Sequence, residues 1–338
     1  MLVKPEAASA LFNGPYALGT LSTADQDAFP ALIRRDGSVV DLRRFLDAPR
    51  LTMLDVMEDW ARLSAAFTGL ADAPSGSDPS GAGPSVDAFR VHAPIAPRQV
   101  LQSGANYRQH VIDLHVAHRD GSDGLSEEEA RAEAAEIMDR RAAEDLPYVF
   151  IGLPSAITGP YDDVTLPAWA KKPDWELELA AVIGRPAFQV TAEQALDHVA
   201  GYTIANDLTD RATVFRRDMP QIGTDWLRSK NGPGFTPLGP WIVPARSFAS
   251  PDDLRVTLKL NGETMQDEST KDMIFPVARL ISYISQTVRL LPGDLVLTGS
   301  PAGNGMHWGR LLRDGDVMDA TITGLGAQRT RCVAEVPA

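Results

Sequence analysis

Two glutamates, Glu176 and Glu178, stand two positions apart in the segment Trp175 to Leu179. On a β-strand, residues i and i+2 project from the same face, with Cα atoms roughly 6–7 Å apart. The run from Leu179 to Ile183 is apolar at every position, which is typical of a strand covered on both faces. Both carboxylates are therefore predicted to be partly buried, although an isolated Glu-x-Glu pair more often marks the wet face of a strand.

A third acid, Asp207, follows the next predicted strand, where an antiparallel return can bring it beside the two glutamates. Two anions about 6 Å apart repel by roughly 3 kcal/mol at an effective dielectric of 20, so the cluster needs protonation or a cation. Three hard oxygen ligands without Cys or His favour Mg²⁺ or Mn²⁺ over zinc. The three carboxylates therefore indicate a divalent-metal site.

A histidine and an acid, His110 and Asp113, are three residues apart, so their side chains can meet on one helical turn. A carboxylate that fixes the imidazole tautomer makes histidine a competent general base near neutral pH. The spacing also fits an ordinary surface pair, because perturbed pairs indicate functional sites only statistically. Lys230 is open to the same two interpretations, since most lysines are simply solvated.

The Gly-rich stretch from Gly299 to Gly305 follows a predicted strand but lacks the lysine and the spacing of a phosphate-binding loop. It also contains no Gly-x-Ser-x-Gly elbow, which disfavours serine-hydrolase chemistry. We therefore predict a tight turn that exposes Ser300.

The elements that must position these residues are mostly strands, so the chain is predicted to be α+β and mainly β. Alternation of apolar residues before Asn261-Gly262 predicts a hairpin with a type I′ turn. An amphipathic helix is predicted to begin after Pro276 and to be closed by Pro292-Gly293. The predicted strands are Leu179–Ile183, Tyr202–Ala205, Trp241–Val243, Leu254–Leu260, Leu295–Thr298, Val317–Ile322 and Thr330–Val336.

The chain has 338 residues, more than the 250–300 or so at which a single core stops growing. We expect a small N-terminal domain over 1–96, with short strands and an amphipathic helix from Leu51 to Leu70. It ends in a flexible linker rich in Pro, Gly and Ser over 72–87. The remainder, 97–338, is predicted to be the catalytic domain.

An insertion over 115–147 interrupts the catalytic domain. A capping box at Ser126 and Glu129 begins a charged, Ala-rich helix, and a Gly-rich hinge precedes it at Asp120 to Gly124. Little apolar surface pins this helix down, so we predict a mobile lid that closes over the metal site. A static surface helix or a dimer contact explains the pattern equally well.

Composition narrows the classes of partner. Hydrophobic residues make up 44% and charged residues 23%, as in ordinary globular proteins. A net charge of −13 is the wrong sign for binding nucleic acid or an anionic membrane surface. The single cysteine, Cys332, excludes an internal disulfide and fits a reducing cytoplasm. No run of 18 apolar residues occurs, so neither a membrane span nor an obvious export signal is expected.

Five motifs together resemble the fumarylacetoacetate hydrolase family, and they follow one another in the family's order between about Gln102 and Val333. Their combination is much more specific than any one of them. The motifs are Asn106-Tyr107-x-x-His110, Glu176-x-Glu178, Gly201-Tyr202-x-x-x-Asn206-Asp207, Pro237-x-Gly239-Pro240 and Leu291-Pro292-Gly293-Asp294-x-Val296-x-Thr298-Gly299-Ser300-Pro301-Ala302-Gly303.

The resemblance implies a mixed β-sandwich roll with a small N-terminal α/β domain, usually assembled as a homodimer. It implies that Mg²⁺ or Mn²⁺ is held by residues matching Glu176, Glu178 and Asp207. It also assigns water activation to His110 with Asp113 and stabilisation of an enolate to Lys230. The substrate contacts implied in the same way are Tyr107, Arg211 and Ser300.

The activity implied by the resemblance is hydrolysis of a carbon–carbon bond in a small oxo acid, either acylpyruvate-like or another 1,3-dioxo acid. Decarboxylation, tautomerisation, hydration or dehydration of a 2-oxo acid through the same enolate chemistry is an alternative, and a metal- or ligand-binding protein without catalysis is another. The chain departs from the family at several places. Ser300 stands where Thr is common and keeps the hydroxyl, and the segment after His110 is longer than in compact members. Asp113 stands where Glu is typical, and Ala212 and Val214 stand where Asp and Gln are frequent.

Overall fold

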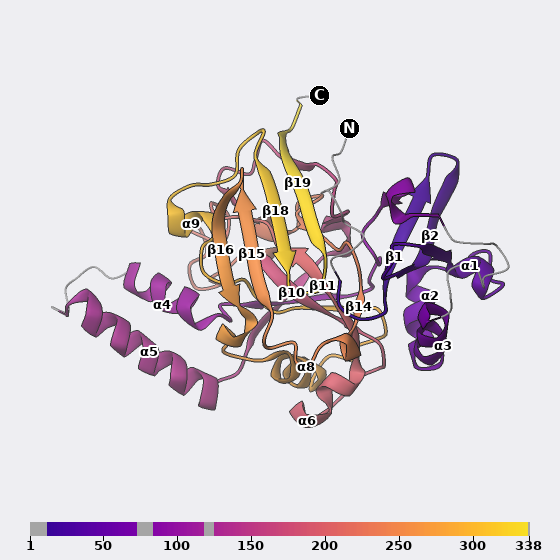
Figure 1. Cartoon of the computed structure of the whole chain (residues 1–338). Coiled ribbons are helices and arrows are strands. Elements are labelled where there is room, and N and C mark those ends of the chain that lie inside the picture. The colour runs from indigo at the N-terminus through magenta and orange to yellow at the C-terminus, as the bar shows by residue number, and fades with distance from the viewer. Residues whose placement is uncertain (1–11, 73–83, 118–124, 337–338) are drawn as a thin grey trace.

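The N-terminal region consists of a four-stranded antiparallel sheet in the order β3-β2-β1-β4, accompanied by three helices (Figure 1). The structure is a computed structural model that describes residues 12–72, 84–117 and 125–336. The elements of this region are β1 (Tyr16–Thr23), β2 (Gln26–Arg34), β3 (Val39–Asp41), α1 (Leu42–Phe45), α2 (Met53–Glu58), α3 (Trp60–Asp72) and β4 (Arg90–Val91).

Two larger sheets form the rest of the molecule. The six-stranded sheet has the order β14-β11-β10-β17-β5-β6 and the five-stranded sheet the order β16-β15-β18-β19-β8. The first contains β5 (Val100–Gly104), β6 (Tyr148–Gly152), β10 (Leu177–Ile183), β11 (Val199–Asn206), β14 (Val243–Pro244) and β17 (Leu295–Leu297). The second contains β8 (Val164–Leu166), β15 (Arg255–Leu260), β16 (Glu263–Ser269), β18 (Val317–Ile322) and β19 (Ala327–Ala334). The predicted α+β, mainly β fold is confirmed.

The described chain also contains four short strands and six further α-helices. Two-stranded pairs join β9 to β12 and β7 to β13. The strands are β7 (Ile157–Thr158), β9 (Pro173–Asp174), β12 (Thr209–Asp210) and β13 (Thr236–Pro237), and the longer helices are α4 (Arg108–Ala117), α5 (Glu127–Glu144) and α8 (Val277–Ser285). The short helices are α6 (Ala192–Ala195), α7 (Trp226–Lys230) and α9 (Gly305–Trp308).

Strand β10 is buried on both faces by two different sets of neighbours. Leu179 lies in the core cluster that also contains Val256 and Leu258 of the five-stranded sheet. The alternate residue Ala180 lies in a second cluster together with Leu18 of the N-terminal sheet. The prediction of a strand covered on both faces is therefore confirmed, because one face packs in the sandwich and the other against the N-terminal region.

Local sequence signals predicted several elements correctly. Asn261 and Gly262 both have positive φ, 53° and 88°, as a type I′ turn between β15 and β16 requires. Two helix predictions were wrong in length. The helix predicted over Leu51 to Leu70 is divided into α2 and α3, and α8 ends at Ser285, before the predicted Pro292-Gly293 stop.

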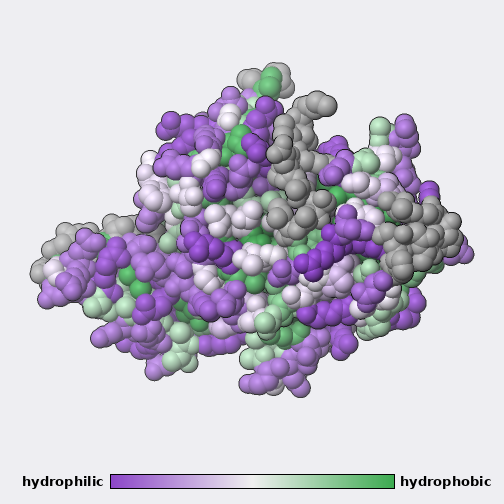
Figure 2. Space-filling model, in the orientation of Figure 1, coloured by the Kyte–Doolittle hydropathy of each residue, from purple (hydrophilic) through white to green (hydrophobic). Residues whose placement is uncertain are grey.

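Helices α4 and α5 project from the side of the molecule opposite the N-terminal sheet (Figure 1). The capping box at Ser126 and Glu129 is formed as predicted. The outward face of this projection is mainly hydrophilic (Figure 2), but α5 also buries Ala130, Ala134 and Met138. Thus α5 is more firmly packed than its charge pattern predicted.

Two sequence predictions fall partly outside the described residues. The linker predicted over 72–87 includes 73–83, and the hinge predicted at Asp120 to Gly124 lies wholly within 118–124. The two-domain division and the lid over 115–147 therefore stay predictions. Among the described residues, no helix has the length and apolar character needed to cross a membrane.

Gly201 allows β11 and β14 to approach closely, and this contact yields a stability prediction. A Cβ atom at Gly201 would lie 2.4 Å from the Val243 carbonyl oxygen, which is backbone and cannot move aside cheaply. We expect Gly201→Ala to lower the free energy of unfolding by about 1–3 kcal/mol, as overpacking of cores usually does. Urea denaturation of the parent and the variant measures the difference.

Gly69 in α3 provides the matched control. It is exposed, and a Cβ atom added there would meet no atom within 4 Å. Gly69→Ala should therefore raise the free energy of unfolding by roughly 0.5–1 kcal/mol, since alanine loses less backbone entropy in a helix. Equal effects of the two substitutions would show that close strand approach is not what Gly201 provides.

Candidate metal centre and active site

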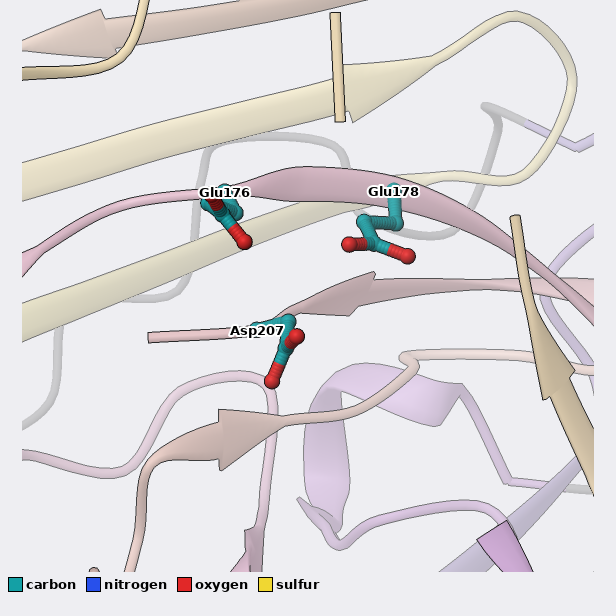
Figure 3. A group of neighbouring side chains, drawn as sticks. All are labelled: Glu176, Glu178 and Asp207. Atoms are coloured by element: carbon teal, nitrogen blue, oxygen red, sulfur yellow. The ribbon is translucent and has the colours of Figure 1, made fainter. Parts of the chain in front are cut away.

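Three carboxylates converge where β10 begins and β11 ends (Figure 3). Leu177 pairs with Asn206 across these antiparallel strands, and the Asp207 amide donates to the Glu176 carbonyl at 2.8 Å. One oxygen atom from each of Glu176, Glu178 and Asp207 lies within 4.8 Å of the others. The structure thus brings together the two glutamates and the third acid as the strand pattern predicted.

Hydrogen bonds from two parts of the chain hold Glu178 and Asp207. The Gly299 amide donates to Glu178 Oε2 at 2.7 Å, so the turn after β17 supports the centre. Gln102 of β5 donates to Asp207 Oδ1 at 2.7 Å. These donors come from β5 and from the turn after β17, and the two strands lie side by side in the six-stranded sheet.

Lys230 supplies a buried positive charge at the centre. Its Nζ atom donates to Glu176 Oε2 at 2.6 Å, to Thr209 Oγ1 at 2.8 Å and to Asp207 Oδ2. The residue is the last of α7, and its ammonium lies over the Phe150 and Trp226 rings, 5.6 and 5.7 Å from their centroids. A lysine only 3% exposed and bonded to two acids is not a solvated surface residue.

The three acids differ in their electrostatic environments. Burial raises the pKa of Glu176, but Arg211 and Lys230 outweigh burial and lower that pKa to about 2. Burial and the nearby Asp207 raise the pKa of Glu178. Burial also raises the pKa of Asp207, and Lys230 only partly offsets it. Because two of the three acids resist ionisation, a further cation would stabilise the cluster.

The donor set fits a hard divalent cation. All three side chains offer carboxylate oxygen, the ligand type that Mg²⁺ and Mn²⁺ prefer, and their spacing allows one ion to reach an oxygen of each. Carboxylates accept more than one contact per oxygen, so the hydrogen bonds to Lys230 and Gln102 leave lone pairs for an ion. Glu176, Glu178 and Asp207 are therefore the residues that would hold the metal.

His110 lies beside the centre on α4, but it does not form the expected pair with Asp113. Burial lowers the pKa of His110 to about 4, although Glu176 acts in the opposite direction. The Asp113 carboxylate instead accepts hydrogen bonds from Gln109 and Arg131, each at 2.8 Å. A competing cation from α5 thus engages Asp113, and the predicted His–Asp hydrogen bond is not formed.

The three predicted substrate contacts have different positions. Arg211 donates from Nη2 to Glu176 Oε1 at 2.6 Å, which places its guanidinium at the metal centre. Ser300, on the turn next to Gly299, is buried and not exposed as predicted, because the turn packs against β16 and Ser300 Oγ accepts a hydrogen bond from Gln266 at 2.9 Å. Tyr107 is completely buried in the main hydrophobic core. Arg211 and Ser300 therefore belong to the site's surroundings. Tyr107 is buried in the core, where burial and the nearby Glu178 raise the pKa of its hydroxyl.

Several residues at the site escaped prediction. Asp174 shares a strand face with Glu176, so the same alternation that singled out the glutamates also points to it. Gln102 and Thr209 carry no comparable signal, because their contacts join segments distant in sequence. His307 has its Nδ1 atom 4.0 Å from Asp113 Oδ2 and is 39% exposed, which places a second histidine near His110.

Comparison with known proteins decides the family. The model of the fumarylacetoacetate (FAA) hydrolase C-terminal domain matches residues 99–333, more than half of the chain. The chain belongs to the fumarylacetoacetate hydrolase family. A fumarylacetoacetate hydrolase from Exiguobacterium antarcticum has the same fold, with a TM-score of 0.70 and 28% identity over 95% of this chain and 100% of that one.

Two curated relatives of the family differ in their reactions. A 2,4-didehydro-3-deoxy-L-rhamnonate hydrolase from Sphingomonas sp. (strain SKA58) is 42% identical over 186 residues, which cover 54% of this chain and 64% of that protein. A mitochondrial oxaloacetate tautomerase from Bos taurus is 41% identical over 182 residues, which cover 53% of this chain and 57% of that protein. The chain thus matches less than two thirds of either relative's length.

Proposed function

We propose that this protein is a divalent-metal-dependent hydrolase that cleaves a carbon–carbon bond in an acylpyruvate-like or other 1,3-dioxo acid. The observation that carries the proposal is the convergence of three carboxylates with Lys230, Arg211 and His110 in one place. A bound Mg²⁺ or Mn²⁺ would act as a Lewis acid that favours negative charge on the substrate's oxygen atoms.

The protein's own residues supply the remaining functions. His110 is neutral near pH 7, because its pKa is lowered to about 4, so it can take a proton from water as that water attacks the remote carbonyl. The carbon–carbon bond then breaks, giving a carboxylic acid and the enolate of a 2-oxo acid. Lys230 and Arg211 are cations that would stabilise that enolate, and the proton that His110 took from water is finally transferred to the enolate carbon, which leaves His110 neutral again.

Tautomerisation of a 2-oxo acid is the second candidate, and one observation favours it. Asp113 is bonded to Gln109 and Arg131 and not to His110, so the water-activating pair is incomplete in this structure. A tautomerase needs enolate stabilisation and proton transfer but no attacking water. The Bos taurus relative is named as an oxaloacetate tautomerase, which supports keeping this alternative.

Product analysis with and without chelator tests both candidates. Metal-loaded protein is expected to release pyruvate from a simple acylpyruvate, to lose this activity in excess EDTA, and to regain it with Mg²⁺ or Mn²⁺. Accelerated keto–enol exchange of oxaloacetate without pyruvate release from acylpyruvates would select the tautomerase. Pyruvate release that is insensitive to EDTA would contradict the metal-dependent mechanism.

We also propose that the protein assembles as a homodimer through an apolar surface beside the site. Strand β6 lies at the edge of the six-stranded sheet, and sheet edges of this kind need to be covered. The Tyr148 hydroxyl accepts a hydrogen bond from Trp226 Nε1 and shares another with Thr224 Oγ1, and these bonds join β6 to α7 and its preceding loop. The large apolar side chains exposed on these three segments include Tyr148, Ile151, Leu153, Phe215, Ile222 and Leu227.

These six side chains are 40–72% exposed, which corresponds to an area on the order of 700 Å², close to what one partner contributes to a standard interface. Light scattering after size-exclusion chromatography should give twice the chain mass of 36.5 kDa. Ile151→Lys should shift the mass toward the monomer, because it places a charge on the apolar edge. A parent protein that remains monomeric at micromolar concentration would contradict this assembly.

A further inference from the structure

Asp174 lies next to the metal centre but outside the set of residues that would hold the ion. It belongs to β9, where it pairs with Thr209 of β12, and it precedes Glu176 by two residues. Alternation along an extended strand gives Asp174 and Glu176 the same direction. Arg211 directly follows β12, so the pairing of β9 with β12 brings its side chain toward both acids.

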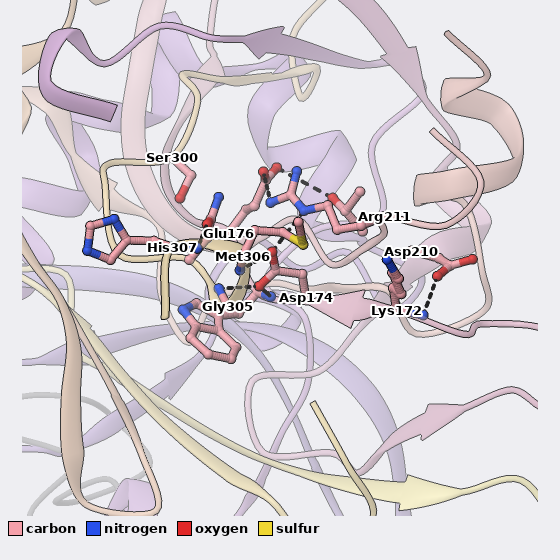
Figure 4. A network of polar contacts seen from close by, with 12 residues as sticks. Lys172, Asp174, Glu176, Asp210, Arg211, Ser300, Gly305, Met306 and His307 are labelled. Carbon is pink, nitrogen blue, oxygen red and sulfur yellow. Dashed lines mark hydrogen bonds and ion pairs between the residues drawn. The ribbon is translucent and has the colours of Figure 1, made fainter. Parts of the chain in front are cut away.

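The Asp174 carboxylate is completely buried and has four donors around it (Figure 4). Oδ1 accepts from the Gly305 amide at 2.5 Å and from the Trp175 amide at 2.8 Å. Oδ2 accepts from Arg211 Nε at 2.8 Å and from the Met306 amide at 3.3 Å. This set fills about four acceptor positions, which is all that a carboxylate offers.

The turn at Gly305 is built to approach this carboxylate. A Cβ atom at Gly305 would lie 2.6 Å from Asp174 Oδ1 and 2.3 Å from the Arg310 carbonyl oxygen, so glycine is required for the contact. The turn follows Ser300 and carries His307 into the region of the site (Figure 4). Asp174 therefore joins three parts of the chain: β9, the arginine after β12, and the first turn of α9.

Arg211 divides its donors between two acids. Nε is bonded to Asp174 and Nη2 to Glu176, which fixes the plane of the guanidinium. Nη1 makes no hydrogen bond within the described part of the chain. It is not fully buried, so it is accessible to solvent. One end of the guanidinium is thus held by the protein and the other is available to a ligand.

We propose that Asp174 is a positioning residue that holds Arg211 in the orientation for binding the carboxylate of a 2-oxo acid. Asp174 does not touch the substrate, and it acts through Arg211. The inference rests on the proposed function, because it assumes that a 2-oxo acid binds beside the metal centre. Without Asp174, Arg211 would keep only Glu176 as an anionic partner, and its guanidinium could rotate.

Asp174→Asn tests this proposal with little change of shape. The asparagine oxygen can still accept from the Gly305 and Trp175 amides, whereas its NH₂ group would face Arg211 Nε, donor against donor. Asp210→Asn is the matched control, because Asp210 is a buried acid on the adjacent strand whose carboxylate accepts, within the described residues, from the Lys172 and Ala212 amides and from no side chain.

The first measurement reports the orientation of Arg211 without any substrate. In ¹H–¹⁵N spectra of Mg²⁺-loaded protein, the Nε–H resonance of Arg211 should be resolved and protected from solvent exchange. It should lose this protection in Asp174→Asn and keep it in Asp210→Asn. An unchanged Arg211 resonance in Asp174→Asn would overturn the proposal, whatever reaction the protein catalyses.

The second measurement reports ligand binding by calorimetry, with oxalate as the probe. Asp174→Asn should weaken oxalate binding at least tenfold while Mg²⁺ still binds with one-to-one stoichiometry. In an Arg211→Ala background the Asp174→Asn substitution should cause no further loss, because its effect passes through the arginine. Additive losses in this double-mutant cycle would overturn the positioning role. Failure of oxalate to bind the metal-loaded parent, with the Arg211 resonance behaving as expected, would count against the proposed function instead.

Discussion

Glu178→Gln is expected to weaken metal binding by at least about a hundredfold and to abolish metal-dependent turnover. Substitutions of groups that merely support metal ligands already cost 10–100-fold, and Glu178 is one of the three carboxylates that would contact the ion. Glutamine keeps the shape of the side chain and an oxygen to accept from the Gly299 amide. Calorimetric titration with Mn²⁺ measures the metal affinity, and metal analysis of the purified variant measures its metal content.

Two comparisons separate metal loss from misfolding. Glu178→Gln removes one of three mutually repelling acids, so the metal-free variant should unfold at the same temperature as the metal-free parent or at a higher one. Glu263→Gln, at an exposed position in β16, should change neither metal affinity nor turnover. Equal metal content and activity in Glu178→Gln and the parent would exclude the carboxylate cluster as the metal centre.

His110→Gln is expected to lower turnover by about 10²–10⁴-fold with metal affinity unchanged, which is the usual contribution of a general base. The imidazole is buried beside Glu176 but is not one of the three carboxylates. Asp113→Ala should shift turnover in the same direction, because its carboxylate lies on the same helix near the base. Steady-state kinetics at saturating Mg²⁺ with an accepted substrate measure both effects.

His115→Gln is the matched control for this prediction. His115 lies on the same helix, α4, and is exposed. His115→Gln makes the same change of side chain away from the metal centre, so its turnover should equal that of the parent protein. If His110→Gln and His115→Gln have equal turnover, His110 is a structural residue and the proton acceptor must be sought elsewhere.

The metal centre could be predicted because its geometry is local. Alternation along one strand places Glu176 and Glu178 on one face, and a single antiparallel return adds Asp207. The apolar run after Glu178 also predicted that both faces of the strand are buried. In the structure one face packs against the five-stranded sheet and the other against the N-terminal region.

The partners of these acids could not be predicted, because they depend on how distant segments pack. Lys230 reaches the acids only when α7 packs against β6, more than 70 residues earlier in the chain. Asp113 was expected to serve His110, but Arg131 arrives from α5 and takes its carboxylate. Spacing along one helix shows which side chains are able to meet, whereas competition from other elements decides which pairs form.

The double burial of β10 has a consequence for engineering this protein. Strand β10, which carries Glu178, belongs to two hydrophobic cores. Its residues Ala180 and Val182 lie in the same core as Leu18 and Trp60 of the N-terminal region. A chain shortened to residues 99–333, the part that matches the family model, would expose this apolar face of β10 to water next to the metal centre. Transplanting the N-terminal region between relatives therefore requires that Ala180 and Val182 of β10 be exchanged along with it.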